Sequence, residues 1–89
     1  MPLVTEALRE LVVSTLSAAC NLDAQTIDLQ TGLADIGVDS MIMATLLTFV
    51  EAEYMCEFSQ QQILQFLQAE SVGQLLQELS QAISAAAVT

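Results

Sequence analysis

The spacing of apolar residues constrains the fold of this chain more than any other feature of its sequence. Over residues 3–19 they recur three to five positions apart, which places them on one helix face, with Glu6, Arg9 and Glu10 on the other. β-branched residues never alternate with polar residues for long, so no strand is indicated. The pattern predicts an all-α fold whose first helix buries Leu3, Ala7, Leu8, Leu11, Val12 and Leu16.

Residues 20–39 interrupt this periodicity with glycine, asparagine and aspartate. The segment is long for a loop in a small domain, because loops of more than about 12–15 residues are uncommon unless they serve a function. Its apolar residues are spaced irregularly, as expected of side chains that anchor a loop to a core. These predicted anchors are Leu22, Ile27, Leu29, Leu33 and Ile36.

A second helix is predicted over residues 40–54, with Asp39 as its N-cap residue. It is the most hydrophobic segment, so we expect it to be the central helix. Apolar spacings of three and four predict a buried stripe, which turns Ile42, Met43 and Thr45 outward or sideways. The stripe consists of Met41, Ala44, Leu47, Val50 and Tyr54, widened by Leu46 and Phe49.

Two potential capping boxes precede the remaining helices, one formed by Ser59 with Gln62 and the other by Ser71 with Gln74. They predict a short helix over about residues 60–67 and a last helix over about residues 72–84. We therefore expect residues 1–89 to form a single domain. Its expected architecture is a four-helix bundle, three main helices plus a short third one, with a long loop between the first two.

The charge of the chain narrows the class of its partners. One arginine stands against eleven acidic residues and no histidine, so the formal net charge is −10. Such a field repels nucleic acids and anionic membranes and attracts basic protein surfaces; the alternative is that it only keeps an apolar chain soluble. The uncharged stretches at residues 11–22 and 41–50 are shorter than the roughly 20 apolar residues that span a bilayer. We expect a cytoplasmic monomer that binds no nucleic acid and does not insert into membranes.

The two cysteines, Cys20 and Cys56, have neither CxxC spacing nor a nearby histidine. We therefore expect free thiols and no metal site. The chain also lacks histidine and lysine, and no group of its residues has the pattern of an acid–base or nucleophilic centre. We expect a non-catalytic module.

Ser40 is the residue with the clearest potential for chemistry. It follows Asp39 and a turn that contains Gly37, where a helix begins and backbone N–H groups carry partial positive charge. A phosphate ester on its hydroxyl would be stabilised there, as anions at helix N-termini are. The alternative is that Asp39 and Ser40 only cap the helix.

Residues 33–41 read LADIGVDSM, and this run resembles the signature of acyl carrier proteins around their phosphopantetheinylated serine. The likeness extends over nearly the whole chain. Residues 51–54 (EAEY) resemble the end of the family's second helix, and Phe58 and the Ser71–Val72 pair keep its order and spacing. The long loop is normal in this family.

The resemblance implies that a phosphopantetheinyl transferase, using coenzyme A and magnesium, attaches 4′-phosphopantetheine to Ser40. Asp39 occupies the position that contacts the transferase in the family. The arm would carry acyl groups as thioesters and present them to a ketosynthase, an acyltransferase or an acyl ligase of the same pathway. The chain itself would catalyse nothing.

The resemblance also implies an apolar cleft between the second and third helices that shelters the acyl chain. For every candidate residue the alternative is ordinary core packing. The candidates are Leu46, Leu47, Val50, Phe58, Ile63, Phe66 and Leu67.

The chain departs from fatty-acid-type carriers just after the serine, where acidic residues usually form the docking face. Ile42 and Thr45 stand at two of those positions, and an exposed Ile42–Met43 pair would favour apolar docking. The alternative is that Ile42 packs against the loop. The predicted docking surface consists of Asp39, Met41, Ile42, Met43, Thr45, Glu51 and Glu53.

These departures favour a discrete carrier of polyketide or other specialised biosynthesis over a fatty acid synthesis carrier, although a domain cut from a larger synthase would look the same. Peptide-synthetase carriers typically show GGxS or GHS at the serine, unlike Gly37-Val38-Asp39-Ser40. An aminoacyl or peptidyl carrier, and a helical interaction domain that never receives the arm, remain as alternatives.

Overall fold

The computed structural model describes residues 2–88, with side chains described over residues 6–85. Within this range the protein contains four α-helices, two 3-10 turns and no strand. The elements are α1 (Pro2–Cys20), η1 (Ala24–Thr26), η2 (Ala34–Ile36), α2 (Ser40–Tyr54), α3 (Gln60–Leu67) and α4 (Val72–Val88). The predicted all-α, four-helix fold with a long loop between its first two helices is confirmed. Of the first-helix residues predicted to be buried, Ala7 is exposed and Leu11 is only half-buried, which corrects their predicted burial, and the side chain of Leu3 lies outside the described residues.

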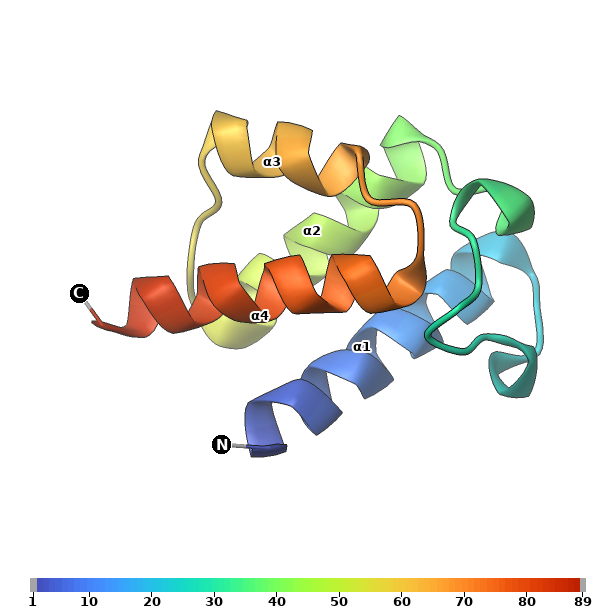
Figure 1. Cartoon of the computed structure of the whole chain (residues 1–89), viewed down its shortest axis with the longest axis horizontal. Coiled ribbons are helices and arrows are strands. Elements are labelled where there is room, and N and C mark those ends of the chain that lie inside the picture. Colours follow the sequence, from blue (N-terminus) through green and yellow to red (C-terminus); the bar gives the residue numbers. More distant parts are fainter. Residues whose placement is uncertain (1, 89) are drawn as a thin grey trace.

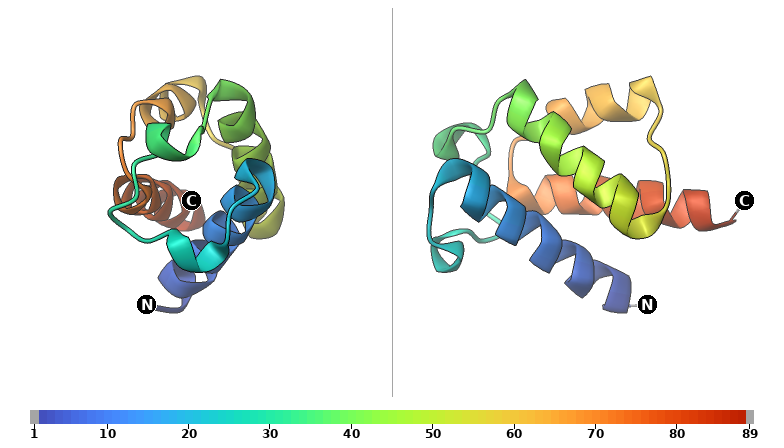
Figure 2. Two further views of the ribbon diagram at one scale, coloured as in Figure 1. Left: turned by 90° about the vertical axis from the view of Figure 1, so that its right-hand side faces the viewer. Right: turned by 180° about the vertical axis from the view of Figure 1, so that it is seen from behind.

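The four helices surround a single hydrophobic core. Figure 1 shows α4 crossing in front, with the short α3 above it. Seen from behind, α1 and α2 lie side by side and run in opposite directions (Figure 2, right). The loop between them lies at the end of the molecule where α1 ends and α2 begins (Figure 2).

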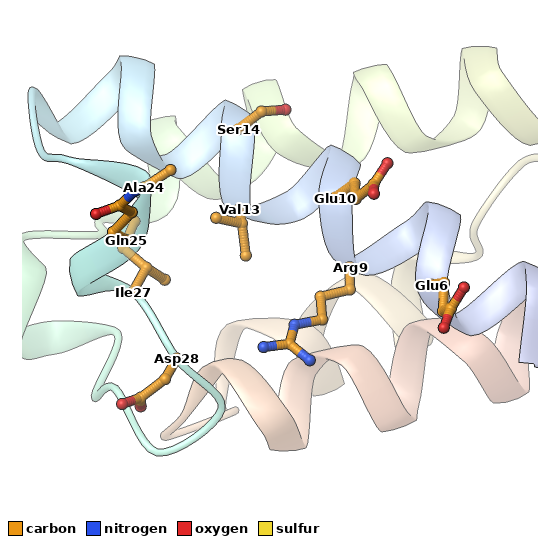
Figure 3. Close-up of a pocket in the computed structure, with 9 residues that line it drawn as sticks. All are labelled: Glu6, Arg9, Glu10, Val13, Ser14, Ala24, Gln25, Ile27 and Asp28. Carbon is orange, nitrogen blue, oxygen red and sulfur yellow. The ribbon is translucent and has the colours of Figure 1, made fainter.

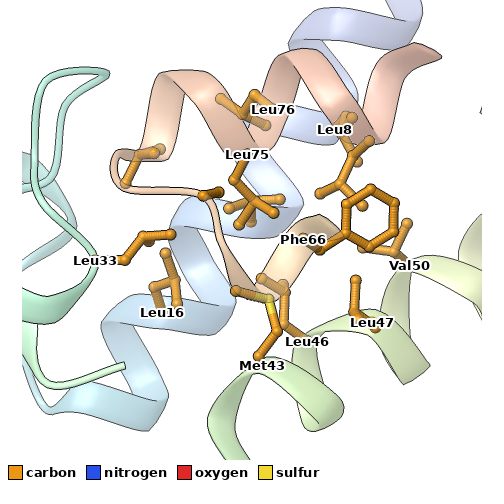
Figure 4. Close-up of a cluster of buried hydrophobic side chains, with 14 of the residues drawn as sticks. Leu8, Leu16, Leu33, Met43, Leu46, Leu47, Val50, Phe66, Leu75 and Leu76 are labelled. Atoms are coloured by element: carbon orange, nitrogen blue, oxygen red, sulfur yellow. The ribbon is translucent and has the colours of Figure 1, made fainter. Parts of the chain in front are cut away.

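The core takes large apolar side chains from all four helices (Figure 4). Leu8 and Leu16 of α1, Leu46 of α2 and Leu75 of α4 are fully buried. Full burial stabilises the fold by about 1.5–3 kcal/mol for each such side chain relative to an exposed one. The ring of Phe66 in α3 is buried as well and meets that of Phe58 edge to face, with 5.0 Å between centroids.

The predicted buried stripe of α2 was wrong in its first half. Met41 is 76% exposed and Ala44 is also exposed, whereas Met43, predicted to point outward or sideways, is only 2% exposed. The reason is geometric: successive spacings of three drift by about 60° around a helix of 3.6 residues per turn, so Met41 and Val50 lie about half a turn apart. The buried stripe is Met43, Leu46, Leu47 and Val50.

The long loop is tied to the start of α4 by backbone hydrogen bonds. The N–H groups of Leu33, Val72 and Gly73 donate to the carbonyl oxygens of Glu70, Thr31 and Leu29, at 3.0, 3.0 and 2.8 Å. An isolated antiparallel bridge between residues 32 and 71 completes this junction.

Of the predicted loop anchors, two are buried, one is half-buried and two are exposed. Ile27 and Leu33 are buried and Ile36 is half-buried against the core. Leu22 and Leu29 are exposed, which corrects their predicted role. At Leu29 the loop is held by a backbone hydrogen bond to α4 and not by burial of the side chain. The spacing of apolar residues in the sequence cannot reveal such a bond.

Candidate functional site

The turn before α2 delivers Ser40 to the surface. Gly37 has φ 86°, in the left-handed region that favours glycine, and its N–H closes η2 by donating to the Ala34 carbonyl at 3.2 Å. The N–H of Val38 then donates to the Leu33 carbonyl at 3.0 Å. These bonds fix the path by which the chain leaves the loop and enters α2.

Asp39 caps α2 in the predicted way. Its backbone is extended, and its carboxylate accepts a hydrogen bond from the N–H of Ile42 at 2.8 Å. Its carbonyl accepts from the N–H of Met43 at 2.9 Å. The Asp39 side chain therefore bonds to the backbone of the helix and not to the neighbouring hydroxyl of Ser40.

Ser40 is the first residue of α2 and is exposed. Among the described residues, neither its Oγ nor the N–H groups of Ser40 and Met41 make a hydrogen bond. An accessible hydroxyl thus stands beside unpaired helix-terminal donors, the arrangement that favours an attached or bound anion.

Both cysteines are free and half-buried. Burial raises the pKa of the Cys20 thiol, and the nearby Asp39 carboxylate raises it further. Burial and then Glu51 raise the pKa of Cys56 in the same direction. Both thiols therefore stay protonated at neutral pH and are poor nucleophiles.

A groove of about 810 Å³ lies between α1 and η1 (Figure 3). The only cation of the chain, Arg9, reaches into it, together with the carboxylates of Glu6, Glu10 and Asp28. No residue of the turn that delivers Ser40 lines this groove. We do not assign the functional site to it.

Over the described part of the chain, no cluster of three or more histidine, cysteine or acidic side chains has the arrangement of a metal site. None of the described helices is both long and apolar enough to cross a membrane.

A protein-family model matches residues 3–88, almost the whole chain, and it describes the C-terminal ACP (acyl carrier protein) domain of the highly reducing polyketide synthase sdgA. The chain belongs to the acyl carrier protein family. No curated protein and no solved structure shows significant similarity to it. Family membership gives this acyl carrier domain a carrier role in polyketide synthesis.

The structure spreads the predicted docking residues of the carrier domain over different environments. Asp39, Thr45 and Glu53 are exposed, as is Met41, whereas Ile42 is half-buried and packs against the core. Met43 cannot contribute an exposed surface, because it lies on the buried stripe of α2.

Glu51 of the carrier domain has a structural task that the sequence did not indicate. Its Oε2 accepts a hydrogen bond from the N–H of Phe58 at 2.8 Å. Its backbone carbonyl accepts from the N–H of Cys56 at 3.1 Å. Glu51 therefore holds the connection between α2 and α3, and its carboxylate is only partly available to a partner.

Most of the predicted cleft residues lie in the core of the carrier domain. Ile63 is half-buried, and Leu67 is 41% exposed. The remaining five are buried: Leu46, Leu47, Val50, Phe58 and Phe66.

Sequence reasoning missed Phe49 as a surface residue and assigned it to the buried stripe. The structure leaves it 53% exposed on the same side of α2 as Met41 and Thr45. The spacing of four between Thr45 and Phe49 could have revealed this shared face. The α1 residues beside Phe49 could not have been found from sequence, because their proximity depends on how the two helices pack.

Proposed function

We propose that Ser40 Oγ is the attachment site of 4′-phosphopantetheine and that residues 1–89 form one carrier domain that transports polyketide-type acyl intermediates. The observation that supports this most is the exposed, unbonded hydroxyl of Ser40 at the first residue of α2, inside the family's signature. The unpaired N–H groups of Ser40 and Met41 fit a phosphate there, because they supply donors and the positive end of the helix dipole.

Attachment is a phosphoryl transfer that a separate transferase must catalyse. The Ser40 oxygen would form a new P–O bond to the phosphate of the phosphopantetheine half of coenzyme A, while the bond to the adenosine half breaks and 3′,5′-ADP leaves. The hydroxyl proton would pass to a base on the transferase, since this chain has no histidine or lysine and the neighbouring Asp39 carboxylate caps α2. Its own residues position the hydroxyl through the Asp39 cap and the Gly37 turn.

When bound, the arm supplies a terminal thiol that holds acyl groups as thioesters. The chain would then present the cargo to partners such as a ketosynthase or an acyltransferase, in the cytoplasm. Tethering raises the local concentration of cargo at a docked partner. Asp39, Met41 and Thr45 are exposed next to Ser40 and are the residues of the predicted docking surface best placed to touch a partner.

The test is incubation with coenzyme A, magnesium and a promiscuous phosphopantetheinyl transferase, followed by intact mass measurement. The parent chain should gain one phosphopantetheine, and Ser40→Ala should gain none. Ser84→Ala, which changes another exposed serine of the described chain, should react like the parent. A parent chain that stays unmodified would favour a helical interaction domain without an arm.

The cargo class is tested separately on the loaded chain. Polyketide-type acyl groups should be transferred to the arm by an acyltransferase, whereas aminoacyl-activating enzymes should leave the arm free. Efficient aminoacyl loading would instead favour a peptidyl carrier.

A further inference from the structure

The solvent-facing side of α2 carries no charge over its first three turns. Its exposed residues recur at helical spacings of three and four, so they share one side of the helix. None of the eleven acidic residues of the chain falls between residues 40 and 50. We call this side the outer face of α2; it consists of Met41, Ala44, Thr45, Thr48, Phe49 and Ala52.

The hydroxyl groups on and beside this face are already used within their own helices. Thr45 Oγ1 donates to the Met41 carbonyl at 3.1 Å, and Thr48 Oγ1 donates to the Ala44 carbonyl at 2.9 Å. On the neighbouring α1, Ser14 Oγ donates to the Leu11 carbonyl at 3.1 Å. Covering these residues with an apolar surface would therefore leave none of these three donors unsatisfied.

A groove of about 430 Å³ runs beside this face, where α1 and α2 lie next to each other (Figure 2, right). The α1 side is built of small side chains, and the ring of Phe49 stands on the α2 side, half exposed. We call it the α1–α2 groove; it is lined by Ser14, Thr15, Ala18, Ala19, Thr45 and Phe49.

The α1–α2 groove is acidic at both ends. Toward Ser40, the exposed carboxylate of Asp39 precedes α2, at the end of the molecule where α1 ends (Figure 2). In the other direction the seam between the helices continues past Ser14 into a hollow lined by Glu10 and Glu53. An uncharged centre thus lies between one carboxylate, that of Asp39, and a pair of carboxylates, those of Glu10 and Glu53.

We propose that the α1–α2 groove takes up one bulky apolar side chain of a partner enzyme, and that this side chain stands between basic side chains on the partner's surface. The inference rests on the proposed function, since the partner is one that receives cargo from the Ser40 arm. The apolar side chain enters the groove beside Phe49. The flanking basic groups face Asp39 at one end and Glu10 and Glu53 at the other.

Charge complementarity selects this partner over a second copy of the chain. Each copy has a net charge of −10 and a single cation, so it cannot supply basic groups at both ends of the groove. Anionic membranes and nucleic acids fail for the same reason. The apolar contact supplies most of the affinity, while the acidic ends mainly accelerate association, as charges at an interface rim do.

The test measures binding of the phosphopantetheinylated chain to the ketosynthase domain of a highly reducing polyketide synthase, using Phe49→Ser and Leu64→Ser as a matched pair. Phe49 of α2 is 53% exposed and Leu64 of α3 is 54% exposed, so both substitutions remove similar exposed apolar groups. Phe49→Ser should weaken binding about tenfold, as expected for a central aromatic contact, whereas Leu64→Ser should change it by less than about twofold. Ala18→Glu, which puts a charge into the groove at an exposed site, should weaken binding like Phe49→Ser.

Salt provides the second readout. Raising the ionic strength should slow association of the parent chain and leave most of the loss caused by Phe49→Ser in place, because screening acts on charges and not on apolar burial. Equal binding of all three variants and the parent would overturn the proposal, and so would a dimer of the parent chain that Phe49→Ser dissociates. Failure of the proposed function would appear earlier and differently, as a chain whose Ser40 accepts no arm.

Discussion

Asp39 serves two purposes that single substitutions can separate. As the N-cap of α2 it accepts a hydrogen bond from Ile42, and as an exposed carboxylate next to Ser40 it can meet a transferase. A helix cap needs an acceptor but no charge, and asparagine supplies one as well as aspartate does.

Asp39→Ala should therefore lower the free energy of unfolding by about 1 kcal/mol, the usual cost of losing a cap. Asp39→Asn should keep most of that stability, because its amide oxygen can still accept from the Ile42 N–H. Urea unfolding followed by circular dichroism measures both. We propose that the transferase contacts the charge of Asp39, so modification of Ser40 should nevertheless slow in Asp39→Asn. Equal loss of stability in the two variants would show that the charge, not the hydrogen bond, stabilises α2.

At the scale of elements, the loop and the start of α4 behave as one unit. Gly73 lies in the first turn of α4 with its N–H bonded to the Leu29 carbonyl, and a Cβ at this position would stand 2.9 Å from that same carbonyl oxygen. The backbone of the loop thus approaches α4 so closely at position 73 that only glycine fits there without a shift of the backbone.

Gly73→Ala should destabilise the fold by about 1–3 kcal/mol, because the crowding outweighs the gain in helix propensity of alanine over glycine, which is about 1 kcal/mol. Gly32→Ala is the control, since there the three atoms nearest to the added Cβ all belong to the exposed Asp35 side chain, whose carboxylate can rotate away. It should change stability by no more than about 0.5 kcal/mol. Chemical denaturation of both variants checks this, and a Gly73→Ala chain as stable as Gly32→Ala would contradict the close approach.

How well the sequence predicted the structure also differed from one element to the next. The helices were predictable because their caps and spacings are local: Ser59 Oγ accepts from the Gln62 N–H at 3.1 Å, and the Gln62 side chain accepts from the Ser59 N–H at 2.8 Å. The second capping box is only half formed, since Gln74 accepts from the Glu70 N–H instead of that of Ser71. Residue 71 pairs with the loop, which is a contact between distant segments.

The candidate site shows the same difference between features set by neighbouring residues and features set by the packing of distant segments. The position of Ser40 at the start of a helix followed from Gly37, Asp39 and the residues after them, which are adjacent in the chain. The buried face of α2 did not follow, because both sides of this helix are apolar and only the packing of the other helices decides between them. The α1–α2 groove requires two helices to meet and has no signal in either one alone.

At the scale of the whole molecule, the titration of half-buried groups links the stability of the fold to alkaline pH. Burial raises the pKa values of Cys20 and Cys56 above their ordinary 9.0, with smaller additions from Asp39 and Glu51. Burial, with a smaller addition from Glu53, also raises that of Tyr54 above 10.0. The folded chain therefore holds these protons to higher pH than the unfolded chain does.

Their contribution to stability is fully present below about pH 9 and is lost as pH rises through the folded-state pKa values. The urea midpoint should thus fall progressively above pH 9. The double variant Cys20→Ser/Cys56→Ser should show a weaker decline, because only Tyr54 then remains of the three. A midpoint that stays constant between pH 8 and 11 would contradict this account.

The most direct test of the carrier assignment is to locate the arm on the chain. After treatment with coenzyme A and a transferase, the intact protein would be fragmented in the mass spectrometer. We predict one phosphopantetheine, carried by every fragment that contains Ser40 and by no fragment that lacks it. An arm found on a different serine, or a Ser40→Ala chain that is modified as fast as the parent, would contradict the central claim.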